Sequence, residues 1–372
     1  MNARLGGGHE IHYASGGHVL EKLRADPSRI THEVPMPVPV EGGSGPSMAR
    51  SLANVLLPAY GRPPLVRQIA DSMRAERRIL DSERFDVVVS DGDMGVNVLA
   101  KNRGITCLFV TNQFRPELHG ARAALYPARE FISRQIAKAS RILVADSPPP
   151  YTVCARNLNF TKEAAGKADY VGCFAAGDPP PAEKTDLERL IEGADYGYWM
   201  RTGDAATSRA TWQTYREAFA ASGDRRVVSH AGAGQDSVTG RDGRTYDISE
   251  ALERRVDWVQ VDAGFLSASQ MRSVVDGCRY AVVNGSHTAM CEILGRGRPV
   301  VGIPVYDEHE NNIRWAEENG LGALAGTAGE AARAIEAIRH DHGRYEGALG
   351  WFREGFDPGG AAAAARLVEG KG

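Results

Sequence analysis

The segment from residue 280 to residue 320 constrains the fold more than any other part of the chain. It opens with an apolar run at 280–283, and a short polar turn separates this run from a helix-like stretch that ends near Leu294. A break rich in Gly and Arg precedes a second apolar run at 300–303, and an acidic turn then leads into another helix-like stretch. This order predicts strand, loop, helix, strand, loop, helix, which is the repeating unit of a parallel α/β sheet.

The two polar turns of this segment should line the same crevice, because loops at the carboxyl ends of parallel strands open onto one edge of the sheet. The first turn enters a helix whose free N–H groups and dipole suit a phosphate, together with the hydroxyls of Ser286 and Thr288. Glu292 follows about one helical turn later, where a carboxylate can accept hydrogen bonds from vicinal sugar hydroxyls. Phosphate and ribose recognition together predict a nucleotide site.

This segment resembles the donor-binding half of GT-B glycosyltransferases, in particular family 28, which includes the lipid II N-acetylglucosaminyltransferase. The residues that carry the resemblance are Gly285, Thr288, Glu292, Pro299, Pro304, the acid and amide cluster at 307–312 and Gly320. The sequence departs from the family pattern at Ser286, where a second Gly is common, and at Ala289, where Thr is usual. His309 and Glu310 also stand where many relatives have Gln.

The resemblance implies an α/β fold of the GT-B type, with two Rossmann-like doubly wound domains that face a cleft. The donor-binding residues that it implies are Gly203, Gly232, Gly234, Gly285, Ser286, His287, Thr288, Glu292, Asp307, Glu308, His309, Glu310 and Asn312. Two of these residues also have a purely structural interpretation. Glu292 could be an acid that stabilises the start of its helix, and Asn312 could be a helix cap. Their joint occurrence with the spaced glycines and prolines favours the donor site.

Length and charge limit the classes of protein that this chain can form. Its 372 residues exceed what a single core usually holds, so two domains are expected. We expect an acceptor-side domain over residues 1–172, a linker over 173–195 and a donor-binding domain over 196–372, whose terminal helix crosses back in GT-B proteins. The net charge of -3 argues against a nucleic-acid binder, for which a basic face is expected.

The cysteines and the apolar runs indicate the compartment. The five cysteines, at 107, 154, 173, 278 and 291, are odd in number and scattered, without a C-x-x-C spacing. They predict buried free thiols in a reducing compartment and no zinc site. No apolar run approaches the length of about 18 residues that a membrane span needs, and no signal peptide opens the chain. We therefore expect a cytoplasmic protein.

One helix-like stretch could bind a membrane surface. Residues 125–140 have a helical apolar period, and they combine basic with aromatic and aliphatic side chains. These side chains are Arg129, Arg134, Lys138, Tyr126, Phe131 and Ile132. A charged surface helix is the simpler interpretation. The alternative, which the resemblance to the lipid II enzyme allows, is an interfacial helix that binds anionic lipid on the inner face of the membrane.

The N-terminus also has two interpretations. Residues 8–11 resemble a family element that normally follows a strand, a glycine-rich loop and a helix, so the first βα unit would be absent. The alternative takes residues 6–9 (Gly-Gly-Gly-His) as the glycine-rich acceptor loop itself, although only five residues are then available for a strand before it. The pattern favours the first interpretation.

The catalytic base should come from the first domain, and three residues are candidates. Asp91 follows an apolar run at 85–90, where a parallel strand delivers side chains to the crevice, whereas Asp93 more simply caps the next helix. His119 lies in the loop after a strand at 106–111, although a lone loop histidine is more often solvated than catalytic. The order of preference is Asp91, His119 and His9.

The resemblance implies an inverting glycosyltransferase that moves a sugar from a nucleoside diphosphate, with UDP preferred, to an acceptor that is a lipid, a glycan or a protein. The helix N-terminus would stabilise the leaving diphosphate, so no cofactor and no metal are expected. Two alternatives stay open. One is an enzyme like the UDP-N-acetylglucosamine 2-epimerase, which shares the two-domain fold, and the other is a non-catalytic nucleotide-sugar binding protein.

Overall fold

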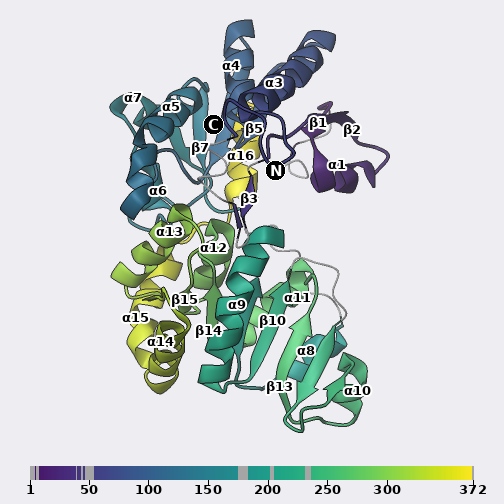
Figure 1. Ribbon diagram of the computed structural model, residues 1–372, viewed down its shortest axis with the longest axis vertical. Helices are drawn as coiled ribbons and strands as arrows, with labels where there is room; N and C mark the ends of the chain where they lie inside the picture. The colour runs from purple at the N-terminus through teal and green to yellow at the C-terminus, as the bar shows by residue number, and fades with distance from the viewer. Residues whose placement is uncertain are drawn as a thin grey trace.

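The computed structural model describes residues 5, 8–38, 40–42, 45–46, 54–174, 183–201, 205–230 and 236–370. These residues form two lobes, and the N-terminal lobe lies above the C-terminal lobe in Figure 1. Gly203, Gly232 and Gly234, for which the sequence predicts donor contacts, lie outside the described residues.

The C-terminal lobe is organised around one sheet with the strand order β12-β11-β13-β10-β9-β14-β15-β16. The strands are β9 (Gly197–Arg201), β10 (Arg226–His230), β11 (Ser237–Gly240), β12 (Thr245–Tyr246), β13 (Trp258–Ala263), β14 (Tyr280–Val283), β15 (Val300–Gly302) and β16 (Gly322–Leu324). The neighbouring strands in the part of the sheet ordered β13-β10-β9-β14-β15-β16 all pair in parallel. Strand β11 is antiparallel to both of its neighbours, β12 and β13. Tyr198, Trp199 and Tyr280 are fully buried in this core, as expected for strands covered on both faces.

Helices connect these strands and cover the sheet (Figure 1). They are α8 (Asp186–Ile191), α9 (Ala205–Ser222), α10 (Ile248–Glu253), α11 (Ala268–Gly277), α12 (His287–Gly295), α13 (Asp307–Glu318), α14 (Ala328–His340) and α15 (Gly343–Gly355). Three of them begin at a capping box, with Thr185, Ser267 or Thr327 as the cap. The reciprocal side-chain bonds of a capping box satisfy two free N–H groups, which fixes where each helix starts.

The N-terminal lobe contains a four-stranded sheet whose strands are all parallel. Its strands are β5 (Val87–Asp91), β6 (Thr106–Thr111), β7 (Arg141–Val144) and β8 (Ala168–Tyr170). The accompanying helices are α3 (Leu65–Ser82), α4 (Met94–Arg103), the 3-10 helix η2 (Gly120–Leu125), α5 (Tyr126–Ile136), α6 (Ala155–Leu158) and α7 (Lys162–Ala165). The carboxyl ends of β5, β6 and β7 therefore point to the same edge of this sheet.

The first elements of the chain stand apart from that sheet. Strand β1 (His12–Ser15), helix α1 (Gly17–Arg24) and strand β2 (Ile30–Glu33) form a separate unit in which the two strands pair in parallel. A short antiparallel pair, β3 (Glu41–Gly42) and β4 (Gly45–Pro46), follows. Within the described residues, the segment before β5 contributes no strand to the four-stranded sheet.

The last helix, α16 (Gly360–Val368), packs against the N-terminal sheet. Ala364 is fully buried there in a cluster with Leu108, Val110 and Leu143. Small side chains on α16 allow this close approach, and the helix begins where the Gly360 N–H donates to the carbonyl of Cys173. The chain therefore connects the two lobes twice.

Helix α5 leaves much of its apolar surface in solvent. Tyr126, Phe131 and Ile132 are 51%, 63% and 38% exposed, and the guanidinium of Arg129 stacks on the Tyr126 ring at 4.2 Å. Among the residues that the structure describes, none of the helices combines the length and the apolar character that crossing a bilayer requires. Helix α5 thus lies on the surface, which is where both interpretations of its sequence place it.

The element order predicted for residues 280–320 is confirmed. Strand β14, helix α12, strand β15 and helix α13 follow one another, and β14 and β15 pair in parallel with Ala281 opposite Val300. The prediction succeeds because each element is marked by local signals: continuous apolar runs for the strands and polar turns rich in Gly and Asn between them.

Candidate functional site

The loops that follow β14 and β15 meet above the carboxyl edge of the C-terminal sheet. Gly285 adopts a φ of +90°, and a Cβ there would lie 2.5 Å from the carbonyl oxygen of His309. Only glycine tolerates both conditions, so the first turn packs directly on the backbone of the α13 N-terminus. The side chain of Asn312 joins the turns by donating to the Gly285 carbonyl at 2.9 Å.

The N-terminus of α12 presents backbone donors at this place. The first helical bond runs from the Met290 N–H to the Ser286 carbonyl, so the N–H groups of residues 287–289 precede the helical ladder. Ser286 makes no side-chain cap bond to the helix, and its own N–H donates to Asn284 Oδ1 at 3.1 Å. Thr288 is exposed in the first turn. Free N–H groups, a hydroxyl and the helix dipole make this a suitable anion site.

Glu292 lies one turn further along α12, four residues after Thr288 and thus on the same face of the helix. Burial raises the pKa of its carboxyl, and the charges of Arg296 and Arg272 oppose this effect. The charge of Glu292 also adds to the burial that raises the pKa of the Tyr198 phenol, which bonds to Ser229 Oγ at 2.6 Å. The Glu292 carboxylate therefore lies near the phenol of Tyr198 in β9.

The acid and amide cluster of α13 faces the N-terminal lobe in this structure. Asp307 Oδ1 accepts from Arg122 at 2.9 Å, and Glu308 Oε1 accepts from Asn112 at 2.9 Å. Burial raises the pKa of Glu308 despite that bond. The sequence predicts donor contacts for both acids, whereas here their side chains hold the two lobes together.

Two other residues predicted to bind the donor, Asn312 and Glu310, make contacts within the protein. Asn312 is fully buried and both ends of its amide are used, because its Oδ1 accepts from Asn157 at 2.8 Å while its Nδ2 holds the Gly285 carbonyl. Its side chain therefore positions the donor turn. Glu310 pairs with Arg314 one turn along α13, which is a local helix contact.

His309 is the member of the cluster that keeps an unused group. It is 8% exposed, and its Nδ1 has no hydrogen-bond partner among the described residues. Burial lowers its pKa to about 4, so the ring is neutral at pH 7. An unpaired buried ring nitrogen costs free energy, which a ligand hydroxyl could offset.

His287 contributes to the site through its backbone alone. Its side chain is buried, and Nε2 lies 2.9 Å from Oδ2 of Asp146, which follows β7 in the N-terminal lobe. Asp146 and Asn157 were not predicted as site residues. The sequence does carry a signal for Asp146, because it is an acid directly after the short apolar run at 142–145.

Among the three candidate bases, His119 contacts the donor side. Its Nε2 lies 2.7 Å from Asn311 Oδ1, half-buried between the lobes. Asp91 ends β5 with its side chain partly in solvent, and burial of the carboxyl raises its pKa. His9 lies 3.8 Å from Glu369 at the end of α16. Asp93 caps α4 by accepting from the Gly95 N–H at 2.8 Å, as predicted.

The tautomer of His119 follows from its partner. Asn311 Nδ2 donates to the Glu117 carbonyl at 3.0 Å and to Asn157 Oδ1 at 2.8 Å, so Asn311 Oδ1 is left to accept. In neutral His119 the proton is thus on Nε2, and Nδ1 carries the lone pair. A continuous chain of donors runs from His119 through Asn311, Asn157 and Asn312 to the Gly285 carbonyl.

Curated relatives and solved structures agree with this architecture. No family model matches the chain. It is 26% identical over 360 residues to an uncharacterized glycosyltransferase of Methanosarcina mazei and 24% identical over 351 residues to one of Methanosarcina acetivorans, covering 90% of this chain and 83% of the relative in each case.

Three solved structures illustrate the likeness in fold. The glycotransferase of kitacinnamycin has a TM-score of 0.63 at 17% identity, over 98% of this chain and 92% of that one. A spinosyn rhamnosyltransferase complexed with thymidine diphosphate has a TM-score of 0.62 at 14% identity, over 97% and 92%. A Phytolacca americana enzyme complexed with UDP-2fluoro-glucose and pterostilbene has a TM-score of 0.60 at 11% identity, over 97% and 99%.

These likenesses confirm the predicted GT-B fold, with two Rossmann-like domains. They also confirm the predicted class of enzyme, because the relatives that match along nine-tenths of the chain are glycosyltransferases by name. They do not extend to family 28, so that closer resemblance stays a prediction.

The Gly285→Ala variant should lose nucleoside diphosphate binding, because a Cβ at this position meets the His309 carbonyl and the φ of +90° is strained for alanine. Calorimetric titration with UDP checks the loss. Gly350→Ala, in an open position on α15, is the matched control and should bind as the wild type does. Unimpaired binding by Gly285→Ala would contradict the placement of the site.

The stability of the protein should fall as the pH decreases from about 6.5 to about 4, because the unfolded chain protonates His309 in that range and the folded chain does not. The full effect is about 3 kcal/mol in the free energy of unfolding. Urea unfolding at several pH values should show a flatter profile for His309→Gln, whereas His340→Gln, an exposed histidine, should follow the wild type. Identical profiles for all three proteins would contradict the buried neutral ring.

Proposed function

We propose that the protein transfers a sugar from a nucleoside diphosphate, with UDP as the first candidate, to an acceptor hydroxyl held against the N-terminal lobe. The observation that carries this proposal is the turn at 285–288, which opens α12 with N–H groups that the helix does not use. Two of the similar structures hold thymidine diphosphate and UDP-2fluoro-glucose. A diphosphate at this turn is the ligand that satisfies both observations.

The turn would stabilise the leaving group. When the bond between the sugar and the diphosphate breaks, its electron pair goes to the diphosphate oxygen. The N–H groups of residues 287–289, the Thr288 hydroxyl and the dipole of α12 would stabilise that charge. We therefore expect the transfer to need no metal at the donor site.

Two further side chains would recognise the rest of the donor. The Glu292 carboxylate, on the Thr288 face of α12, would accept hydrogen bonds from the ribose hydroxyls. The neutral His309 ring offers its Nδ1 to a hydroxyl of the transferred sugar. Together with the turn, they would bind the diphosphate, the ribose and the transferred sugar of the donor.

His119 is our choice for the base. Its bond to Asn311 leaves the lone pair on Nδ1, which could take the proton of an acceptor hydroxyl. The freed oxygen would attack the anomeric carbon on the side opposite to the diphosphate, so the configuration inverts. Because Asn311 belongs to α13, the base would be oriented only when the two lobes are in contact.

Calorimetric titration with UDP, GDP and dTDP, followed by a turnover assay, tests the proposal. Release of UDP that depends on an acceptor supports transfer. An epimer formed without acceptor would show the epimerase alternative, and binding without any product would show the non-catalytic alternative. Failure of all three nucleotides to bind would contradict a nucleotide-sugar site altogether.

Replacing Glu292 with Ala should weaken UDP binding by at least about tenfold, or about 1.4 kcal/mol, because the ribose loses its acceptor. Calorimetric titration of the folded variant measures the change. Glu354→Ala, an exposed glutamate on α15, serves as the control with unchanged affinity. The ribose assignment is wrong if Glu292→Ala and the control bind UDP equally well.

Replacing His119 with Ala should reduce kcat by about 10²- to 10⁴-fold and leave the Kd for UDP within a few-fold of the wild type, because a base acts in the transition state. Steady-state kinetics and calorimetry measure the two quantities. Asp91→Asn tests the rival base. A large loss of kcat in Asp91→Asn, with little in His119→Ala, would reassign the role.

A further inference from the structure

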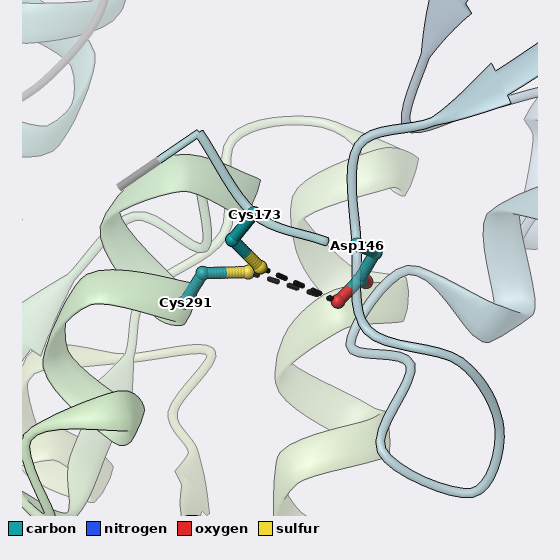
Figure 2. Close-up of side chains that lie close together, drawn as sticks. All are labelled: Asp146, Cys173 and Cys291. Carbon is teal, nitrogen blue, oxygen red and sulfur yellow. Dashed lines mark hydrogen bonds between the residues drawn. The ribbon is translucent and has the colours of Figure 1, made fainter. Parts of the chain in front are cut away.

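Three of the five cysteines gather with an acid and a histidine where the two lobes meet. The group consists of Asp146, Cys154, Cys173, His287 and Cys291, and all five residues are buried. Figure 2 shows the thiols of Cys173 and Cys291 side by side, both directed at the Asp146 carboxylate. The remaining two cysteines, Cys107 and Cys278, lie elsewhere in the core and are free thiols.

The group is assembled from three separate parts of the chain. Asp146 follows β7 and Cys173 follows β8, so both come from the carboxyl edge of the N-terminal sheet. His287 and Cys291 come from α12, and their spacing of four residues puts them on one face of that helix. The cluster therefore connects the N-terminal lobe to α12, the helix that follows the turn at 285–288.

Most distances in the cluster are close to those around a tetrahedral ion, and the shortest one, between His287 and Asp146, is a hydrogen bond that a bound ion would replace. Asp146 Oδ1 lies 3.7 Å from Cys173 Sγ and 3.9 Å from Cys291 Sγ. His287 Nε2 lies 3.4 Å from Cys291 Sγ and 2.9 Å from Asp146 Oδ2. A tetrahedral zinc with its usual bond lengths puts neighbouring ligand atoms roughly 3.3–3.8 Å apart. The thiols approach Oδ1 and the imidazole approaches Oδ2 of the same carboxylate, so the side chains must move together to bring one atom from each of the four residues onto one ion.

The types of donor atom select the metal. Two thiolates, one imidazole nitrogen and one carboxylate oxygen suit zinc, whereas calcium and magnesium require mostly oxygen ligands. The carboxylate is also held in place, because the backbone N–H groups of Ser147 and Cys154 donate to it at 2.7 and 2.9 Å. Hydrogen bonds of this kind orient a metal ligand and tune its affinity.

We propose that Asp146, Cys173, His287 and Cys291 form a structural zinc site that fastens α12 to the N-terminal lobe. On binding, the two thiols release their protons to solvent, and the imidazole proton of His287 moves from Nε2 to Nδ1. Both sulfurs and the Nε2 lone pair then bond to the ion. Four protein ligands close the coordination shell, so the ion holds structure and leaves the reaction to the donor site. The cysteine spacing alone predicts no zinc site, because the residues of this cluster are far apart in the sequence.

Cobalt titration of the full-length protein tests the site. The protein is reduced, stripped with a chelator and titrated with Co²⁺, which gives intense visible bands when thiolates bind it tetrahedrally. We expect saturation at one ion per chain and displacement by Zn²⁺. Cys173→Ser and Cys291→Ser should each weaken Co²⁺ binding by more than about tenfold, because the hard hydroxyl replaces a soft ligand.

Cys278→Ser and Cys107→Ser are the matched controls, since both residues are buried free thiols outside the cluster. They should bind Co²⁺ as the wild type does, and Zn²⁺ should raise their melting temperature equally. The wild-type titration decides the question even if a variant fails to fold. The proposal is overturned by a folded, reduced wild type without tetrahedral Co²⁺ bands, or by full binding in the Cys173→Ser/Cys291→Ser double variant.

Discussion

The hydrogen bonds of Asn157 hold the candidate site together. This side chain is fully buried, it accepts from Asn311 at 2.8 Å, and it donates to Asn312 at 2.8 Å and to the Glu308 carbonyl at 3.2 Å. A buried amide that loses its partner costs about 1–3 kcal/mol, so the four groups are strongly interdependent. One residue of the N-terminal lobe thereby positions the N-terminus of α13.

This constraint couples the two halves of the proposed reaction. At one end of the amide chain, Asn311 orients the imidazole of His119, and at the other end Asn312 holds the carbonyl of Gly285. The same contact between the lobes thus positions both His119, the proposed base, and the turn at 285–288. The cluster of Asp146 with His287 adds a second contact at the start of α12. Together they make the geometry of the site depend on how the lobes meet.

The secondary structure of the donor segment could be predicted from local sequence signals. Contacts between residues far apart in the sequence could not, because no local signal marks them. The alternation of apolar runs and turns places β14, α12, β15 and α13, and the cap at Asp93 follows from its position before a helix. The pattern does not tell which polar residues face the other lobe, and the side chain of Asn312, a predicted donor residue, contacts Asn157 of that lobe. Pairs such as Asp146 and His287 are 141 residues apart, and no local spacing reveals them.

A crystal structure of the protein with UDP tests the central claim most directly. The account predicts that the diphosphate oxygens accept hydrogen bonds from the backbone N–H groups at the start of α12, and that the ribose hydroxyls reach the Glu292 carboxylate. A diphosphate bound at the edge of the N-terminal sheet, or a ribose without contact to Glu292, would contradict it.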